Sequence, residues 1–362
     1  MKPDFYSRQL AETIMKRYPD PVDFPYRPWC YSQGFMLWGM IRLWESTQDQ
    51  VYLDYVLTLV NHFVSSDGSL SAFRGDSMDD MMAGSLLVWA WTHTRDDRFR
   101  KACDTVRRAS DNYPRTSDGT FWHGRDTRGQ VWVDGLFMGQ MFLAKYGRFV
   151  GDAGYCFDEC ARQISQVARH CRKHGTGLML HAWSEDRSVN WADPETGLSP
   201  EVWSEGLGWY ALILVETLDV LPPDHTHRPA IVTLLQKLLA DLRTHQDPRT
   251  GLWYQVVDKG MRTDNWHDTS GSAMFVYAIR KALELGLADP ALYASVAGRG
   301  YEGIVSKIAT NAEGLVDVID ACDGLCVQPS YDAYVNYPRV VNAKEAVGAV
   351  LWATGIVERL GC

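Results

Sequence analysis

The chain has 362 residues, a formal net charge of −9, 46% hydrophobic residues and 22% charged residues. This is the composition of a globular protein, and it excludes a disordered chain. The acidic balance excludes nucleic acid as the partner, because phosphate binding requires a basic surface. The tryptophans (14) and tyrosines (17) fit either a large aromatic core or the flat walls of a carbohydrate cleft.

The beginning of the chain, residues 1–6, carries no apolar run of leader length, and no uninterrupted apolar stretch is long enough to span a bilayer. We therefore expect a cytoplasmic protein that binds no membrane. The sequence does not define the oligomeric state, for which we expect a monomer or a weak homo-oligomer.

The cysteines, 8 in number, are too sparse in a chain of this length for a disulfide framework, so we expect lone cysteines in the core. Cys156 and Cys160, and likewise Cys322 and Cys326, have a spacing that predicts each pair on one face of a helix. The histidines at 170 and 174 lack the acidic base of an H-E-x-x-H metal motif. We expect no metal site.

A short signature of a turn, a glycine and alternating large residues recurs about every 60 residues. Its copies are Asp67-Gly68-Ser69-Leu70, Asp118-Gly119-Thr120-Phe121, Thr176-Gly177-Leu178-Met179, Thr250-Gly251-Leu252-Trp253 and Glu313-Gly314-Leu315-Val316. Between these copies, apolar residues recur at helical spacing, which predicts pairs of helices. The predicted helices span 33–46, 50–64, 82–92, 99–112, 135–146, 151–170, 206–221, 227–245, 269–285, 288–308 and 343–360.

About twelve helices in six hairpins predict an all-α fold, an (α/α)6 barrel or toroid, rather than a bundle. The glycine turns should line one rim, with short strands such as 252–257 over it, and the site should lie at that rim. Proline at the first helical position is typical of a helix start, which predicts starts at Ser199-Pro200-Glu201 and at Asp289-Pro290. No linker divides the chain, so residues 1–362 should form one domain.

The carboxylate of Asp134 lies in the otherwise apolar and aromatic run from Val131 to Phe142. An apolar setting disfavours the charged form, so we expect a raised pKa, as a proton donor near neutral pH requires. The alternative is that Asp134 caps a helix beginning at Gly135, since Asp is a favoured N-cap residue. A capping role is also the alternative for Asp79.

Polar residues next to aromatic ones fall at the same end of successive predicted hairpins. Convergence of Asp, His and Trp at one rim is what a site that processes sugars requires. These residues occur in the segments 29–34, 78–81, 121–124, 132–134, 181–183 and 190–210.

The ordered motifs from about residue 26 to the C-terminus resemble glycoside hydrolase family 105, the unsaturated rhamnogalacturonyl hydrolases. The central match is Trp132-Val133-Asp134-Gly135-Leu136-Phe137-Met138, which is similar to the motif around the catalytic aspartate of that family. The other matching segments are 29–34, 199–203, 208–211, 251–258, 270–275 and 341–348.

This resemblance implies an (α/α)6 barrel that removes a 4,5-unsaturated uronic acid from the non-reducing end of lyase products, with no metal and no cofactor. It implies that Asp134 is the general acid/base, which protonates C4 of the enol ether before water adds at C5, and that Asp79 is the second catalytic carboxylate. Asp80 could take the place of Asp79, and the sequence does not separate them. By the same resemblance, the unsaturated sugar is held by Tyr31, His123, Trp132, His181 and Trp209.

One position departs from the family pattern. Where relatives commonly have an arginine that helps to bind the uronate, this chain has Glu205, which we place among the substrate-binding residues. An acceptor in place of a charge-assisted donor weakens carboxylate recognition or moves it to another residue. The candidates for that residue are Arg125, Arg128, Arg339 and Lys344. The substrate can therefore be an unsaturated glucuronyl rather than a rhamnogalacturonyl unit.

Two other classes of function fit the same residues. One is a different α/α-toroid enzyme, either a sugar epimerase or an inverting glycosidase, which needs two carboxyl groups about 6.5–9.5 Å apart. The other is a non-catalytic sugar-binding relative, for which Glu205 is the reason. Faster turnover of a saturated substrate favours the first, and binding without turnover favours the second.

Overall fold

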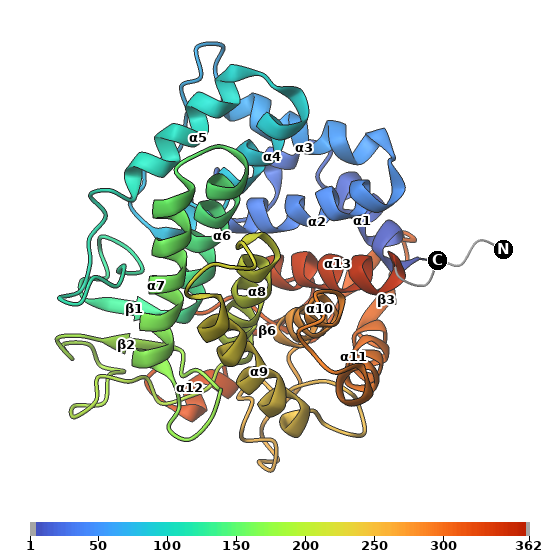
Figure 1. Ribbon diagram of the computed structural model, residues 1–362. Helices are drawn as coiled ribbons and strands as arrows, with labels where there is room; N and C mark the ends of the chain where they lie inside the picture. Colours follow the sequence, from blue (N-terminus) through green and yellow to red (C-terminus); the bar gives the residue numbers. More distant parts are fainter. Residues whose placement is uncertain (1–4, 360–362) are drawn as a thin grey trace.

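Six helices form a closed inner ring in the computed structural model, which describes residues 5–359 (Figure 1). Each inner helix packs against the next, and the last packs against the first. Their surfaces are buried almost all round, as expected for helices without a polar face. The inner helices are α2 (Tyr31–Thr47), α4 (Gly84–Thr94), α6 (Val133–Phe149), α8 (Ser204–Val220), α10 (Thr269–Glu284) and α13 (Lys344–Arg359).

Six further helices form an outer layer around this ring, toward the periphery of Figure 1. Each buries one apolar face, as α3 does with Tyr52, Val56, Leu59 and Phe63. The outer helices are α1 (Tyr6–Arg17), α3 (Gln50–Phe63), α5 (Asp97–Ala109), α7 (Ala153–Cys171), α9 (Arg228–His245) and α11 (Pro290–Val305). The two layers confirm the predicted (α/α)6 barrel.

The helix α1 is absent from the sequence-based prediction, and it completes the sixth hairpin. It packs against α13, so one hairpin is built from both ends of the chain. The backbone N–H groups of Tyr6 and Ser7 donate to the Glu358 carboxylate, each at 3.0 Å. This carboxylate satisfies N–H groups at the start of α1 that have no partner within the helix. Residues 1–4, part of the segment read for a leader, lie outside the described residues.

Two local predictions are wrong. No helix starts at Ser199, because this segment pairs with the β2 region: the Ser199 hydroxyl accepts from Ala182 N–H at 2.9 Å, and α8 begins only at Ser204. Residues 252–257 are not a strand, since they form only isolated bridges, between Tyr254 and His267 and between Val256 and Trp203. The start at Asp289-Pro290 is confirmed, with Asp289 as the N-cap of α11.

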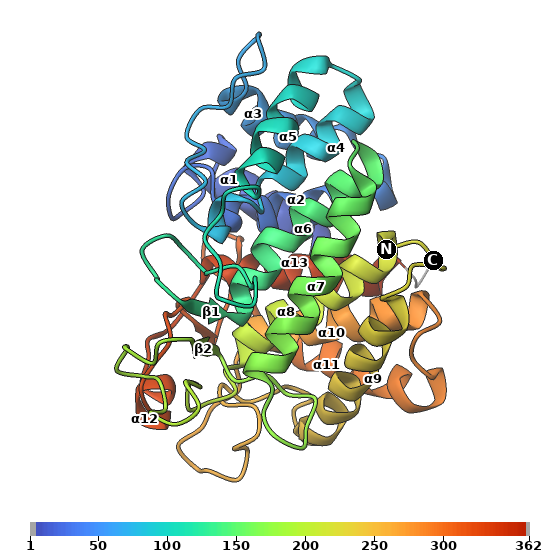
Figure 2. The same ribbon diagram turned by 60° about the vertical axis from the view of Figure 1, so that its left-hand side comes forward.

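The short strands and one small helix lie in the loops at the end of the ring where the inner helices begin. Figure 2 shows β1, β2 and α12 together on that side. The strands pair antiparallel as β1–β2, β3–β4 and β5–β6. They are β1 (Gln130–Trp132), β2 (Ala182–Ser184), β3 (Ile308–Thr310), β4 (Val316–Val318), β5 (Ala321–Cys322) and β6 (Arg339–Val340). The small helices are α12 (Tyr331–Val335) and the 3-10 turns Pro21–Asp23 and Met78–Asp80.

The cysteine pairs differ from each other. Cys156 and Cys160 are buried together on α7, as predicted. Cys322 lies in β5 and Cys326 in the loop that follows, so the prediction of a shared helix face is wrong for this pair. The cysteines of the described part of the chain are free, and all except Cys326 are buried.

The recurring glycines lie at the predicted end of the barrel, but they do not line the cavity described below. Each of the first four packs closely against the next outer helix. A Cβ atom on Gly177 would lie 2.5 Å from the Lys237 backbone of α9, and one on Gly251 would lie 2.1 Å from the Arg299 carbonyl of α11. Gly68 approaches the Arg98 carbonyl of α5, and Gly119 approaches the Arg162 side chain of α7. The first four copies of the repeat therefore join their hairpins to the next one, whereas nothing lies within 4 Å of a Cβ added to Gly314.

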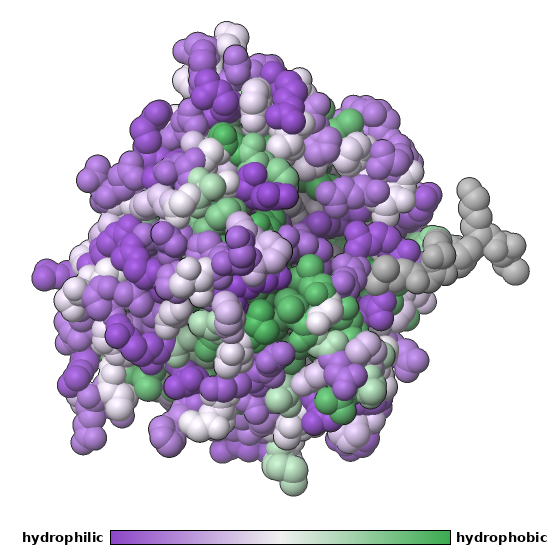
Figure 3. Space-filling view, in the orientation of Figure 1, coloured by the Kyte–Doolittle hydropathy of each residue, from purple (hydrophilic) through white to green (hydrophobic). Residues whose placement is uncertain are grey.

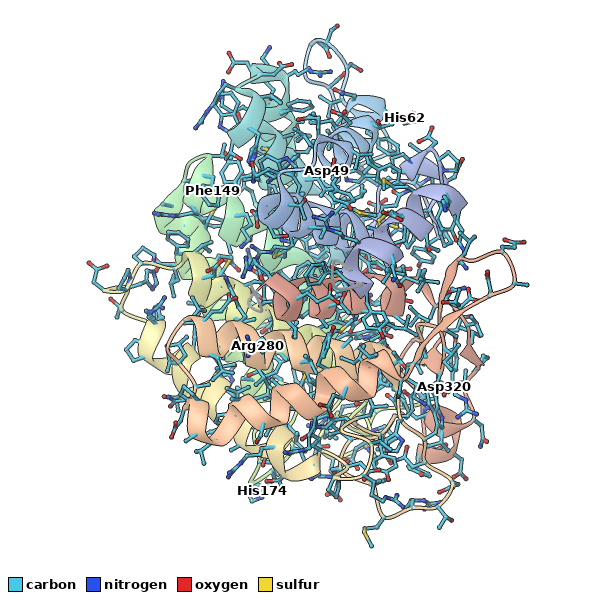
Figure 4. The ribbon with its side chains drawn as sticks, turned by 90° about the vertical axis from the view of Figure 1, so that its right-hand side faces the viewer. Asp49, His62, Phe149, His174, Arg280 and Asp320 are labelled. Carbon is cyan, nitrogen blue, oxygen red and sulfur yellow. The ribbon has the colours of Figure 1, made fainter. Side chains whose placement is uncertain are left out.

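Figure 3 shows one face of the molecule, which is mostly hydrophilic, with apolar residues gathered near its middle. In Figure 4, Phe149 at the end of α6 lies on one side of the molecule, and Asp320, beside the strands of the loops, lies on the other. Between residues 5 and 359, no helix is long and apolar enough to cross a bilayer.

Candidate active site

A cavity of about 640 Å³ opens at the end of the ring where the inner helices begin. This volume lies within the range of small-molecule sites. Its wall includes eight of the nine site residues predicted from the sequence: Tyr31, Asp79, Asp80, His123, Trp132, Asp134, Glu205 and Trp209. The exception is His181, which is fully buried behind the wall.

Three of these eight side chains come from the first turns of inner helices, as does the side chain of Lys344, which also lines the cavity. Tyr31 is the first residue of α2, Asp134 the second of α6, Glu205 the second of α8 and Lys344 the first of α13. Asp79 and Asp80 lie in the 3-10 turn that precedes α4. Helix N-termini carry partial positive charge, so the ring directs positive potential at the cavity floor. An anionic ligand is favoured there.

The side chain of Asp134 does not cap its helix. The N-cap position of α6 belongs to Trp132, and Asp134 lies within the first turn. Its Oδ1 atom is buried without a hydrogen-bond partner, 3.7 Å from Nε2 of His181. The capping interpretation is therefore wrong, and the carboxylate is free to act in the cavity.

The predicted direction of the Asp134 pKa is also wrong. Burial raises the pKa of Asp134, but its interactions with His181 and His123 outweigh burial and hold the pKa below its usual value. For Asp79 the balance is reversed, because burial and the nearby charge of Asp134 raise its pKa despite His123 and Arg27. Of these two carboxyl groups, Asp79 is therefore the one that keeps a proton to higher pH.

The neighbouring aspartates Asp79 and Asp80 have different environments. Asp80 is buried, and one of its oxygens accepts from Arg27 at 2.6 Å. Asp79 lies 3.9 Å from Arg27 and 4.0 Å from Nε2 of His123. Since Asp80 is bound to arginine and Asp79 interacts with Asp134, the geometry favours Asp79 as the second carboxylate.

His123 and Trp132 form one aromatic side of the cavity. Their rings are stacked, with centroids 4.1 Å apart and planes 9° apart. The hydroxyl group of Tyr31 donates to Glu345 at 2.5 Å, and the ring of Tyr31 packs edge to face on Trp209. Flat aromatic faces beside polar groups suit the alternating apolar and hydroxylated faces of a sugar.

Glu205 belongs to a buried group of acids beneath the cavity. It accepts from the Ser270 hydroxyl at 2.8 Å, and Ser270 also interacts with Asp268, the N-cap of α10. Burial, followed by the charges of Glu345 and Asp268, raises the pKa of Glu205 well above its usual value. Glu205 therefore takes up a proton at higher pH than an ordinary glutamate, and in its protonated form it does not repel an anion.

The cavity holds a buried cation next to Glu205. Lys344 lines the wall with a side chain that is 14% exposed, and its Nζ lies 2.8 Å from Glu345. Burial lowers the pKa of Lys344, but the carboxylates of Glu345 and Glu205 raise it above its ordinary value, so the ammonium stays charged. Of the other candidates, Arg125 lines the cavity with an exposed side chain, while Arg128 and Arg339 lie outside the lining.

Several lining residues were not in the predicted set. Trp203 and Met138 lie within quoted motifs and Arg27 lies just before one, so their positions in the sequence were a usable signal. The loop 324–326, which also lines the cavity, has no such signal. Within residues 5–359, no group of three or more His, Cys, Asp or Glu residues is arranged to hold a metal ion.

Comparisons with known proteins agree with this geometry. The model of Glycosyl Hydrolase Family 88 matches residues 6–360. A solved family 105 glycoside hydrolase from C. acetobutylicum is 31% identical, with a TM-score of 0.92 over 98% of this chain and 99% of that chain. The unsaturated rhamnogalacturonyl hydrolase YesR of Bacillus subtilis is 23% identical over 335 residues, 91% of this chain and 88% of YesR.

The fold is shared more widely. The solved unsaturated glucuronyl hydrolase of Bacillus sp. GL1 has a TM-score of 0.71 at 17% identity, covering 98% of this chain and 95% of that one. The matched family model spans nearly the whole chain, and the family 105 structure matches it from end to end. The chain therefore belongs to Glycosyl Hydrolase Family 88, and it is a glycoside hydrolase related to the family 105 enzymes.

Proposed function

We propose that the protein releases a 4,5-unsaturated uronic acid from the non-reducing end of oligosaccharides that polysaccharide lyases produce. The observation that carries this proposal is the Asp79–His123–Asp134 arrangement on the wall of a cavity with aromatic sides. Hydration of an enol ether requires one proton donor at the double bond and no nucleophilic carboxylate. A pair of carboxyl groups that shares one proton suits this chemistry.

In the proposed reaction, Asp134 delivers a proton to C4 of the bound sugar, and positive charge develops at C5 and the ring oxygen. Water adds at C5 and returns its proton to Asp134. The resulting hemiketal opens to a ketone at C5, which leaves a hemiacetal at C1, and collapse of this hemiacetal to an aldehyde releases the remaining sugar. Asp134 thus ends in its starting protonation state, so one water is consumed and no cofactor takes part.

The lowered pKa of Asp134 in the empty site is compatible with this role. A uronate that enters the cavity adds a negative charge and displaces water, and both effects raise the pKa of a neighbouring carboxyl group. Asp79 keeps a proton to higher pH than Asp134 does, because its pKa is raised whereas that of Asp134 is lowered. Substrate binding therefore favours transfer of that proton to Asp134, where the double bond lies.

We assign the uronate carboxylate to Lys344. This lysine is the less exposed of the two proposed anchors that line the cavity, and it lies beside Glu205, where relatives commonly have arginine. A lysine binds as a point charge, whereas an arginine binds in two-pronged fashion, so the sugar carboxylate is held at a single point. The uronide is of the rhamnogalacturonyl or glucuronyl type.

We also propose that residues 1–362 form one domain.

The experiment is a panel of lyase-generated unsaturated disaccharides, followed by loss of the ultraviolet absorbance of the double bond. Asp134→Asn should abolish the loss, because the amide has the same shape and no acidic proton. Asp126→Asn is the matched control, since Asp126 is an exposed aspartate of the same cavity. Undiminished turnover by Asp134→Asn would contradict the proposal.

Two outcomes of the panel would point elsewhere. If saturated glycosides react faster than unsaturated ones, the protein is an ordinary glycosidase that uses the Asp79 and Asp134 pair across the bond. If unsaturated uronides bind to the wild-type protein without turnover, it is a sugar-binding relative whose chemistry has been lost.

A further inference from the structure

A buried chain of polar side chains runs from α12 to the proposed catalytic aspartate. Tyr334, on α12, is fully buried, and its hydroxyl oxygen lies 2.9 Å from Nδ1 of His181. On the other side of the imidazole, Nε2 faces Oδ1 of Asp134 at 3.7 Å. Nε2 and Oδ1 are both buried, and neither has a hydrogen-bond partner.

The partners of Tyr334 and of the His181 ring determine which nitrogen of His181 carries the proton. The hydroxyl oxygen of Tyr334 accepts from the Gln328 backbone N–H at 3.3 Å. A phenol has two acceptor positions and one donor hydrogen. On the other side of the ring, Nε2 faces a carboxylate oxygen, which accepts a hydrogen bond and donates none, so the phenol hydrogen is directed to Nδ1 of His181. Nδ1 is then the acceptor nitrogen, and the proton of the neutral ring is on Nε2.

The position of the imidazole is fixed on all sides. Its ring lies 4.5 Å from that of Trp203 and 5.9 Å from that of Trp132. His181 N–H donates to Glu201 O, and its carbonyl accepts from Val133 N–H, each at 3.0 Å. The second of these bonds ties His181 to the residue before Asp134. Nε2 lies 3.7 Å from Oδ1 of Asp134, so the Nε2–H···O bond forms when the carboxylate moves toward the ring.

We propose that Tyr334 is a positioning residue for Asp134: its hydroxyl holds His181 in the Nε2–H tautomer, so that this N–H is presented to the Asp134 carboxylate. The bond orients one oxygen of Asp134 toward the histidine and leaves the other for the sugar. It also stabilises the carboxylate that forms once the proton has been given up. The catalytic consequence rests on the proposed function, whereas the tautomer does not.

The other ionisable groups around this chain come from several elements. The carboxyl group of Asp79 and the imidazole of His123 act on Asp134 from the cavity side. The thiols of Cys171, on α7, and Cys326, in the loop after β5, also face its charge. Burial lowers the pKa of His181 more than Asp134 raises it, so the imidazole remains neutral near pH 7. A neutral ring is the state to which the tautomer assignment applies.

The first test is nitrogen-15 NMR of histidine-labelled protein, with His181→Gln used to assign the signal. The wild-type protein should show His181 with Nε2 protonated and Nδ1 unprotonated. Tyr334→Phe should lose this preference. Tyr331→Phe is the matched control on the same helix, because its hydroxyl donates to Asp264 at 3.0 Å instead. A wild-type His181 protonated on Nδ1 would overturn the proposal without any variant.

The second test is kinetic and uses an unsaturated disaccharide. Tyr334→Phe should lower kcat about tenfold, the equivalent of one hydrogen bond, and leave KM nearly unchanged. The limb of the pH profile that reports Asp134 should move to higher pH, because the carboxylate loses a donor. A purely structural role for Tyr334 predicts lower thermal stability with the same pH limb and tautomer, and that result would overturn the proposal. If Asp134→Asn retained activity, the proposed function would fail, but the NMR result would still stand.

Discussion

Arg27 and Asp80 form a 2.6 Å ion pair that leaves the adjacent Asp79 directed toward His123 and Asp134. The pair separates two neighbouring aspartates by environment, one bound to arginine and the other next to the reacting centre.

This separation predicts different defects for the two amide variants. Asp79→Asn should lower kcat by about 100-fold, because the shared proton of the pair is lost. Asp80→Asn should instead lower the free energy of unfolding by about 1–3 kcal/mol, since a buried charge-assisted bond to Arg27 is broken. Both values come from steady-state kinetics and chemical denaturation of the same preparations. The reverse pattern would make Asp80 the second carboxylate.

Glu205→Gln should make the protein more stable at neutral pH. Burial, with the charges of Glu345 and Asp268, raises the pKa of Glu205, so the folded protein keeps a proton that the unfolded chain releases. Wild-type stability is therefore unaffected below the ordinary glutamate pKa of about 4.3 and falls as the pH rises above it. The variant carries no such proton. Its advantage in thermal unfolding at pH 7 should vanish toward pH 4, and an equal advantage at both pH values would contradict this account.

Lys344→Met should raise KM for an unsaturated uronide about 10- to 100-fold, because one charge-assisted bond to the carboxylate is lost. The methyl ester of the same substrate has no charge to bind, so the variant and the wild type should handle it alike. Arg125→Met removes an exposed cation from the same cavity and serves as the control. A larger effect of Arg125→Met would indicate that Arg125, rather than Lys344, binds the uronate carboxylate.

Gly135→Ala should lower kcat about tenfold without unfolding the protein. A Cβ atom at this position would lie 2.7 Å from Nδ1 of His123, so the imidazole has to shift on Trp132. Gly355→Ala is the control within another inner helix, because nothing lies within 4 Å of its added Cβ. That control should be neutral or stabilising by about 0.5–1 kcal/mol. Circular dichroism and kcat distinguish the two effects.

The sequence predicted the long helices well, because an apolar period of 3.6 residues needs no tertiary information. It failed at Ser199, where the helix signal of Pro200 is overridden by pairing with the β2 region. It also omitted α1, whose apolar face is covered only when the chain ends meet at α13. These two errors have one cause, since in each case the partner that decides the structure lies outside the segment itself.

The sequence predicted most residues of the site but not the directions of their pKa shifts. The apolar run around Asp134 indicated a raised pKa, yet two histidines from other loops reverse the shift. Tyr334 was missed because α12 has only five residues, too few to show a helical period. The sequence also did not reveal that the pKa of Glu205 is raised, since its acidic neighbours Glu345 and Asp268 are far from it in the sequence and meet it only under the cavity.

The common direction of the six inner helices has an evolutionary consequence. The starts of α2, α6, α8 and α13 and the turn before α4 contribute residues to the same cavity, while the side chains that keep the ring closed follow further along each helix. Selection for a new sugar can therefore act on a few opening positions, such as 31, 205 and 344, without disturbing the closure of the ring. A lost hairpin, in contrast, would remove part of the scaffold and part of the recognition surface together.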